Sequence, residues 1–158
     1  MFKTMLILAA FSLAATPALA TEADFYGSWK ITESVKAPWE DPANPMTTDD
    51  SERYTDKIVE IAKGSMKGPD LMGCGVTELA VQSFPYAGLF EGGLGVKPGD
   101  AAAPYDEAKA KRLAEGLGFT AEPVESLMHG CSELILHRLD ASTLVFGLNN
   151  RIFTMKKQ

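Results

Sequence analysis

The stretch that decides the fold is residues 143–156, TLVFGLNNRIFTMK. Two runs rich in aliphatic, aromatic and β-branched residues, 143–148 and 151–156, flank the pair Asn149 and Asn150. Asparagine tolerates the left-handed backbone of a two-residue turn. The pattern therefore predicts a β-hairpin in the last part of the chain.

Further strands are predicted upstream of this hairpin. Residues 124–131 predict one strand, residues 134–139 a second strand or its continuation, and residues 140–142 a turn. Residues 29–35 alternate in polarity with one misfit, and residues 57–62 and 71–83 predict another strand and a strand pair. These segments indicate an α+β fold that is mainly antiparallel β, a small barrel of about seven or eight strands whose closure removes exposed edges.

One helix is predicted, over residues 103–116. Pro104 suits its first turn, and Asp106 and Glu107 face the positive end of its dipole. Gly116 or Gly118 can end it. Its narrow apolar side predicts that it leans on the sheet or covers a barrel end.

A long connection spans residues 36–56 and has no useful periodicity. Such a length is typical of a lid, a binding loop or a mobile segment. Trp39 is its one large apolar side chain, which either plugs the core or is presented to a ligand. The segment also carries three prolines and six acids: Pro38, Pro42, Pro45, Glu40, Asp41, Asp49, Asp50, Glu52 and Asp56.

A second loop, residues 84–99, is rich in glycine and carries three aromatic residues, Phe84, Tyr86 and Phe90. Its glycines free the backbone for turns with positive φ. They do not form a phosphate loop, because no G-K-[ST] ending and no strand-to-helix setting accompany them.

Residues 1–20 have the pattern of an export signal. Lys3 precedes an apolar run over residues 5–15, and Pro17 precedes the A-x-A site Ala18-Leu19-Ala20, which predicts cleavage between Ala20 and Thr21. The run is too short to span a bilayer, and no cysteine at the cleavage point could accept a lipid. We therefore expect a soluble periplasmic or secreted protein, with residues 21–158 as a single domain.

Charge and cysteine content narrow the possible partners. Removal of Lys3 with the signal takes the net charge from −6 to −7, which disfavours nucleic acid and anionic lipid as ligands. A cationic partner would suit this charge, but the simpler interpretation, which we favour, is that the charge only keeps an exported protein soluble. The mature chain has two cysteines, Cys74 and Cys131, and an even number in an oxidising compartment predicts one disulfide. In the chain-entropy model this disulfide stabilises the folded state by roughly 4 kcal/mol.

Gly27-Ser28-Trp29 opens the first predicted strand. It resembles the Gly-x-Trp signature of the calycins, the barrel superfamily of lipocalins, avidins and certain bacterial protease inhibitors. The resemblance implies that Trp29 closes one barrel end beneath a basic side chain from near the last strand, for which Arg151 is the matching residue. The mid-chain helix departs from a lipocalin, whose helix comes near the end, and calycins share architecture across unrelated activities.

The residue pattern does not favour catalysis, a metal site or a cofactor. His129, Cys131 and His137 share strand parity, but the histidines would lie about 27 Å apart on one strand, too far to hold one ion. Ser132 lacks a G-x-S-x-G elbow, and Asp49 and Asp50 lie in a polar loop where carboxylates keep ordinary pKa values.

These observations leave a binding protein as the main hypothesis. The acidic segment 40–56 and the aromatic segment 84–90 would contact an exported enzyme or an envelope component, as in an inhibitor or interaction module. The alternative is a carrier that holds a small apolar ligand inside the barrel, and a small hydrolase is a second alternative. The tentative binding residues are Trp39, Asp49, Asp50, Phe84, Tyr86 and Phe90.

Overall fold

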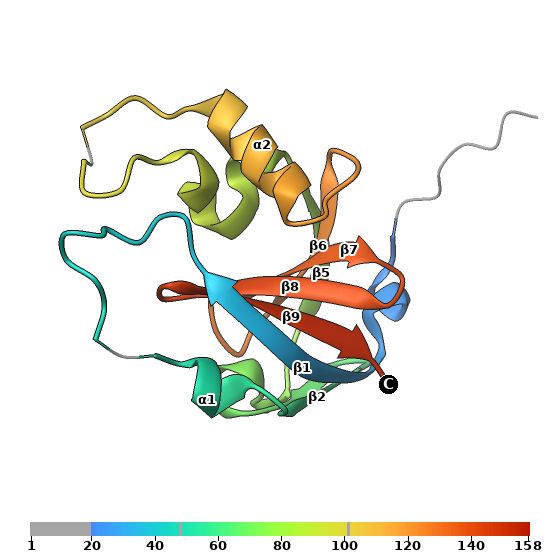
Figure 1. Cartoon of the computed structure of the whole chain (residues 1–158). Coiled ribbons are helices and arrows are strands. Elements are labelled where there is room, and N and C mark those ends of the chain that lie inside the picture. Colours follow the sequence, from blue (N-terminus) through green and yellow to red (C-terminus); the bar gives the residue numbers. More distant parts are fainter. Residues whose placement is uncertain (1–19, 48, 101) are drawn as a thin grey trace, which may run out of the picture.

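The computed structural model describes residues 20–47, 49–100 and 102–158, and these form a mainly antiparallel β fold (Figure 1). Nine strands in this part of the chain make one sheet, in the order β4-β3-β2-β1-β9-β8-β7-β6-β5, which curls into a half-barrel. The strands are β1 (Gly27–Lys36), β2 (Ile58–Ala62), β3 (Ser65–Lys67), β4 (Gly75–Val76), β5 (Leu79–Phe84), β6 (Val124–His129), β7 (Ile135–Asp140), β8 (Thr143–Leu148) and β9 (Arg151–Lys157). The helices are α1 (Ser51–Tyr54), α2 (Glu107–Gly116) and the 3₁₀ segments η1 (Glu22–Phe25), η2 (Asp70–Met72) and η3 (Tyr86–Gly95).

The predicted terminal hairpin is confirmed. Strands β8 and β9 pair around Asn149 and Asn150, and Asn149 takes the left-handed φ of 52°. Phe146 lies opposite Phe153, and their stacked rings are 5.0 Å apart between centroids. Strand β9 also pairs with β1, so the first and last strands of the chain lie together at the centre of the sheet.

The sheet has nine strands, more than the seven or eight predicted, because β3 is only three residues long and too short to show a period. The prediction of two strands within residues 71–83 is confirmed by β4 and β5, but these strands do not pair with each other. Strand β4 forms one edge of the sheet and β5 forms the other. The register of the long central strands decides this arrangement, and a two-residue strand carries no sequence signal for it.

The predicted disulfide between Cys74 and Cys131 is present, and it links the two sides of the curled sheet. Cys74 precedes edge strand β4, while Cys131 follows β6, the neighbour of edge strand β5. Backbone hydrogen bonds from Thr77 to Gly64 and from Gly130 to Glu78, each 3.1 Å, strengthen the same closure.

Helix α2 begins at Glu107, later than predicted. Asp106 has an extended backbone and its carboxylate accepts a hydrogen bond from the Lys109 amide at 2.8 Å, so it caps the helix. The glycine-rich segment upstream is not an open loop, because η3 consists of two short 3₁₀ turns on either side of a kink at residues 89–92. In the middle of η3, Phe90 and Glu91 have φ values of 51° and 56°, which turn the chain sharply.

Two apolar cores lie on opposite faces of the sheet. Alternating residues decide the face: Leu144 and Phe146 belong to the core on the barrel side, and Val145 to the core under the helices. Figure 1 shows α2 lying over the helix-covered face. The barrel core contains Phe25, Trp29, Ile31, Tyr54, Val59, Ile61, Met66, Met72, Leu79, Leu127, Leu136, Leu144, Phe146, Phe153 and Met155. The helix-side core contains Ala37, Tyr86, Leu89, Phe90, Leu94, Ala110, Ala114, Phe119, Val124, Val145 and Ile152.

Trp29 is buried, with 1% of its surface exposed, but Arg151 is not beside it. Antiparallel pairing places Trp29 opposite Lys157, whose ammonium lies 5.1 Å from the indole centroid. Arg151 starts β9 and pairs with Lys36 at the other end of the ladder, where it contacts Asp49. The predicted contact between Arg151 and Trp29 is therefore wrong, because the register brings the end of β9 to the start of β1.

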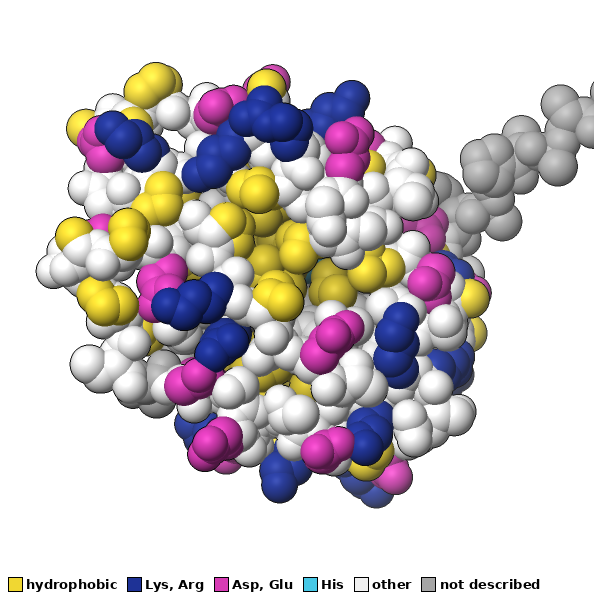
Figure 2. Space-filling view, in the orientation of Figure 1, with side chains coloured by type: hydrophobic (Ala, Val, Ile, Leu, Met, Phe, Trp, Pro, Cys, Tyr) yellow, Lys and Arg dark blue, Asp and Glu magenta, His cyan; other side chains and the backbone are white. Residues whose placement is uncertain are grey.

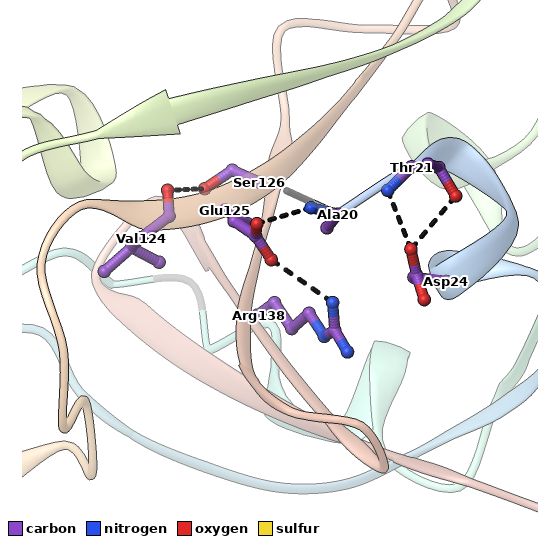
Figure 3. A network of polar contacts seen from close by, with 7 residues as sticks. All are labelled: Ala20, Thr21, Asp24, Val124, Glu125, Ser126 and Arg138. Atoms are coloured by element: carbon purple, nitrogen blue, oxygen red, sulfur yellow. Dashed lines mark hydrogen bonds and ion pairs between the residues drawn. The ribbon is translucent and has the colours of Figure 1, made fainter. Parts of the chain in front are cut away.

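The predicted signal peptide falls on residues 1–19, which lie outside the described residues, and on Ala20. Figure 3 shows how the first described residues attach: the Ala20 amide donates to Glu125, which also accepts from Arg138 at 3.2 Å. The Thr21 amide and hydroxyl donate to Asp24 at 2.7 and 3.0 Å. No helix within residues 20–47, 49–100 and 102–158 is long and apolar enough to cross a membrane.

Candidate functional site: a pocket at the rim of the half-barrel

A half-open pocket of about 560 Å³ lies at the end of the half-barrel where β7 starts and β8 ends. This end is opposite η1 and Trp29, as the separation of η1 from the β8–β9 turn in Figure 1 makes clear. Five parts of the chain converge there: the 36–56 connection, η2, η3, the β6–β7 loop and the end of β8. We call it the rim pocket; its lining residues are Trp39, Leu71, Phe90, Glu91, Gly93, Ser132, Glu133, Leu134, Ile135, His137, Gly147, Leu148 and Asn149.

Trp39 is a half-buried wall of the rim pocket. Its indole N–H donates to the Asn149 carbonyl at 2.7 Å, and its ring lies 5.7 Å from that of Phe90 between centroids. Two glycines pack closely on the Trp39 ring. A Cβ at Gly93 would come within 2.6 Å of the ring, which excludes a side chain there, and a Cβ at Gly147 would make a tight contact at 3.2 Å. Trp39 thus both packs on the helix-side core and faces the pocket.

The three aromatic residues of the 84–99 segment have separate places. Phe90 lines the rim pocket with only 8% of its surface exposed, and Tyr86 is buried at 6% beneath the helices. Phe84 is half-buried and meets the imidazole of His137 edge-on at 6.0 Å. The prediction that all three present themselves to a partner is wrong for Tyr86, whose ring is used by the core.

His137 lies beneath Phe90 and forms a hydrogen-bonded pair with Ser126 that the sequence analysis missed. The Phe90 amide donates to Nε2 at 3.2 Å, and Nδ1 lies 2.8 Å from the Ser126 hydroxyl oxygen. Since Nε2 accepts, a neutral ring carries its proton on Nδ1 and donates it to Ser126, which in turn donates to the Val124 carbonyl at 3.3 Å.

This arrangement cannot activate a serine. A general base needs a free lone pair toward the hydroxyl, and in His137 the nitrogen nearest Ser126 is the donor. Burial lowers the pKa of His137 to about 3, so its ring is neutral at ordinary pH. The pair is best understood as a satisfied polar contact inside an aromatic cluster, where cross-strand neighbours far apart in sequence meet.

The acids predicted to face a partner are bound by the chain itself. Asp50 is only 3% exposed and accepts from the Asn149 side-chain amide at 2.6 Å. Asp49 accepts from Arg151 and from the Ser51 amide, and hydrogen bonds from Ser51 first and Arg151 second lower its pKa to about 2. The prediction of Asp50 as a contact residue is wrong, because both acids fasten the long connection to the β8–β9 turn.

Glu40 has the same structural role. It accepts from the Asn150 side chain at 3.0 Å, and the Lys36 ammonium lies 3.2 Å from its other oxygen. Hydrogen bonds from Asn150 and then Lys36 lower the pKa of Glu40. The turn of the hairpin therefore orders the long connection, and that order holds Trp39 at the rim.

The two histidines lie on separate strands, His129 on β6 and His137 on β7. A loop separates β6 from β7. His129 lies opposite Leu79 of β5 and shares its face of the sheet, while His137 faces the helices. His129 is 5% exposed, burial lowers its pKa, and neither ring nitrogen has a partner in the described residues. No group of three His, Cys, Asp or Glu side chains within this part of the chain could hold a metal ion.

Comparison of the chain with models of known protein families, with curated proteins and with solved structures finds no match. The function must therefore be inferred from the site. What the rim pocket offers is an apolar hollow of defined shape with polar groups at its border, which suits binding.

A second apolar surface is visible from the side shown in Figure 1. Apolar side chains gather in a hollow between α2 and the central strands, bordered by charged groups (Figure 2). The helix-side core reaches the surface there, and its partly buried members include Leu113, Leu117 and Leu139. The rim pocket differs from this surface in that aromatic side chains from separate parts of the chain, Trp39 and Phe90, form its walls.

Proposed function

We propose that this protein is an exported, non-catalytic binding protein and that the rim pocket is its recognition site for an exported or envelope-associated protein partner. The observation that carries the proposal is the contrast between a filled barrel and an open rim. Fifteen buried apolar residues occupy the barrel side of the sheet, whereas the rim pocket of about 560 Å³ opens to solvent. A pocket of this size accepts a large side chain or a short segment of a partner.

The walls of the rim pocket are preorganised, which favours binding. Leu71 belongs to η2, close before Cys74, and Ser132 and Glu133 follow Cys131, so the disulfide ties two walls together. The bond from Trp39 to Asn149 fastens a third wall to the hairpin turn. A rigid site of this kind loses little conformational entropy when its partner binds.

Export is supported by the sequence pattern of residues 1–20 and by the disulfide, which is stable in an oxidising compartment. A calycin-like origin of the barrel is also part of the proposal. It is supported by Gly27-Ser28-Trp29 at the start of β1 and by the cation from the last strand over the indole.

A carrier of a small ligand is the second candidate, now placed in the rim pocket instead of the barrel. The pocket volume is within the range of small-molecule sites. The barrel-side core speaks against the earlier idea of an internal cavity, because its large side chains Trp29, Phe146 and Phe153 are at most 1% exposed.

The test uses two tryptophan variants on either side of Cys74. Leu71→Trp adds bulk at the rim pocket, where Leu71 is 48% exposed, and Val76→Trp adds the same bulk off the pocket, where Val76 is 89% exposed. The wild-type protein is used to capture a partner from an envelope extract, and the affinity of the purified partner is then measured for all three proteins. We expect Leu71→Trp to weaken binding at least about tenfold and Val76→Trp to leave it unchanged. Equal affinity of all three would place the recognition site elsewhere.

A further inference from the structure

The charged side chains that line the rim pocket are all negative. Two carboxylates, Glu91 from η3 and Glu133 from the β6–β7 loop, line the pocket, and its lining includes no lysine or arginine. Both side chains are exposed, and neither forms a hydrogen bond or ion pair with any described residue. By contrast, Asp49, Asp50 and Glu40 near the same rim are bound by Arg151, Asn149 and Asn150. The pocket therefore has negative charge that the chain itself does not neutralise.

The other large side chains that line the rim pocket are apolar or aromatic. Trp39 and Phe90 lie 5.7 Å apart between ring centroids and are tilted by 35°, and Leu134, Ile135 and Leu148 complete the apolar lining. Aromatic faces attract cations, and organic ammonium ions are bound well by aromatic residues combined with acids. His137 beneath Phe90 is neutral because burial lowers its pKa, so it does not repel a cation.

The backbone conformation in the middle of η3 brings Glu91 to the border of the rim pocket. Phe90 and Glu91 both have positive φ, 51° and 56°, and Gly92 follows at 82°. Two successive non-glycine residues in this conformation are costly and persist only when surrounding contacts hold them. The contact of the Phe90 amide with His137 is one such contact, and the consequence of the turn is that Glu91 borders the pocket.

Building on the proposed function, we infer that the rim pocket binds an organic ammonium group, a protonated primary amine carried on an apolar chain. The volume of about 560 Å³ and the apolar lining require an apolar body, and the two unneutralised carboxylates require a positive end. A bare metal ion does not fit this chemistry, since it needs several oxygen or nitrogen ligands close together. The ammonium can belong to a free alkylamine or to a lysine side chain of a protein partner.

The experiment compares three probes of equal chain length: hexylammonium, hexanol and hexanoate. Binding to the wild-type protein is measured by calorimetry and by two NMR signals, the indole N–H of Trp39 and the backbone amide of Glu91. We expect hexylammonium to bind about tenfold more tightly than hexanol, hexanoate not to bind, and added salt to weaken only the ammonium. The double variant Glu91→Gln/Glu133→Gln should lose most of the preference for the ammonium while hexanol binds as before.

A matched control removes two exposed carboxylates away from the pocket, Glu52→Gln/Glu60→Gln, and should behave like the wild type. Two short peptides, one with lysine and one with norleucine at the same position, distinguish a protein source of the ammonium from a free amine. If hexanol and hexylammonium bind equally at the rim pocket, the inference is wrong while the proposed binding site stands. If no probe shifts the signals of the pocket and Leu71→Trp leaves partner affinity unchanged, the proposed function fails as well.

Discussion

Each end of the half-barrel has a tryptophan: Trp29 lies at a closed end, whereas Trp39 lies at the end that opens into the rim pocket. Trp29 donates its indole N–H to the Phe25 carbonyl at 2.8 Å, and η1 and Lys157 leave 1% of it exposed. Trp39 donates to the Asn149 carbonyl at 2.7 Å, yet one side of its surroundings is the rim pocket. The same polar contact satisfies both indoles, so the hydrogen bond does not decide whether a tryptophan closes an end. What decides it is whether neighbouring elements cover the ring.

We expect the largest loss of stability when the closed end of the half-barrel is disrupted. Trp29→Ala should lower the free energy of unfolding by roughly 3 to 5 kcal/mol, because a large side chain is removed from a well-packed core. Trp39→Ala should cost about 1 to 2 kcal/mol, since its ring is only half-buried. Urea denaturation followed by circular dichroism measures both. Equal losses would mean that the two ends are equally closed.

Removing the disulfide should act on the open end. In the chain-entropy model a sequence separation of 57 residues corresponds to about 4 kcal/mol, and measured values are often smaller. We expect Cys74→Ser/Cys131→Ser to lose about 2 to 4 kcal/mol and to broaden the NMR signals of residues lining the rim pocket, while the indole signal of Trp29 stays sharp. Broadening at Trp29 and not at Trp39 would contradict this assignment of the disulfide to the rim.

Acid should weaken the protein through the buried histidines. The pKa of His137 falls from 6.5 to about 3 on burial, so the unfolded chain binds the proton first. The stabilising contribution of the neutral ring is complete above pH 6.5 and is lost as the pH falls toward 3, at about 1.4 kcal/mol per pH unit. Burial lowers the pKa of His129 as well, which adds to the slope.

The measurement is the free energy of unfolding between pH 7 and 4.5, above the range where the carboxylates titrate. His137→Gln is the matched variant, because a glutamine oxygen can accept from the Phe90 amide but does not titrate. Its stability should depend less on pH than that of the wild type. An unchanged slope in His137→Gln and in His129→Gln would show that neither imidazole is buried in its neutral form.

The smallest effect concerns the cation at the closed end. Lys157→Ala should cost about 0.5 to 1 kcal/mol through loss of the contact with the Trp29 ring, as for other exposed cation–π pairs. Arg151→Ala should leave the fluorescence of Trp29 unchanged, since Arg151 lies at the opposite end of the ladder. If substitution of Arg151 shifts that fluorescence and substitution of Lys157 does not, the predicted contact between Arg151 and Trp29 would be supported after all.

Local patterns were enough to predict several features of the fold. The Asn149–Asn150 turn, the run of β-formers on each side and the glycine after the helix all act through neighbours in the chain. The start of α2 was missed by four residues, because the capping side chain of Asp106 and not Pro104 decides where the helix begins. Strand β3 was missed because three residues are too few to show a period.

The rim pocket could be predicted only in part. Trp39 was singled out as one large apolar residue in a polar segment, and Phe90 as part of an aromatic loop. Glu91, Glu133 and the segment around Ser132 gave no signal, since single exposed acids and serines are common on any surface. The same reason explains the wrong emphasis on Asp50, whose partner Asn149 is 99 residues away.

The sequence by itself determined the mainly antiparallel β class of the fold, the central hairpin and the pairing of Cys74 with Cys131, because each follows from periodicity, turn chemistry or a count of two. The burial of Trp29 was implied by the resemblance of Gly27-Ser28-Trp29 to the calycin signature. Only the tertiary structure decided which cation covers Trp29, which acids the chain neutralises and which it leaves free at the rim. Those outcomes depend on strand register and on the curl of the sheet, which bring residues far apart in sequence within a few ångströms. A one-dimensional pattern carries information about neighbours along the chain, and the site is made of neighbours across it.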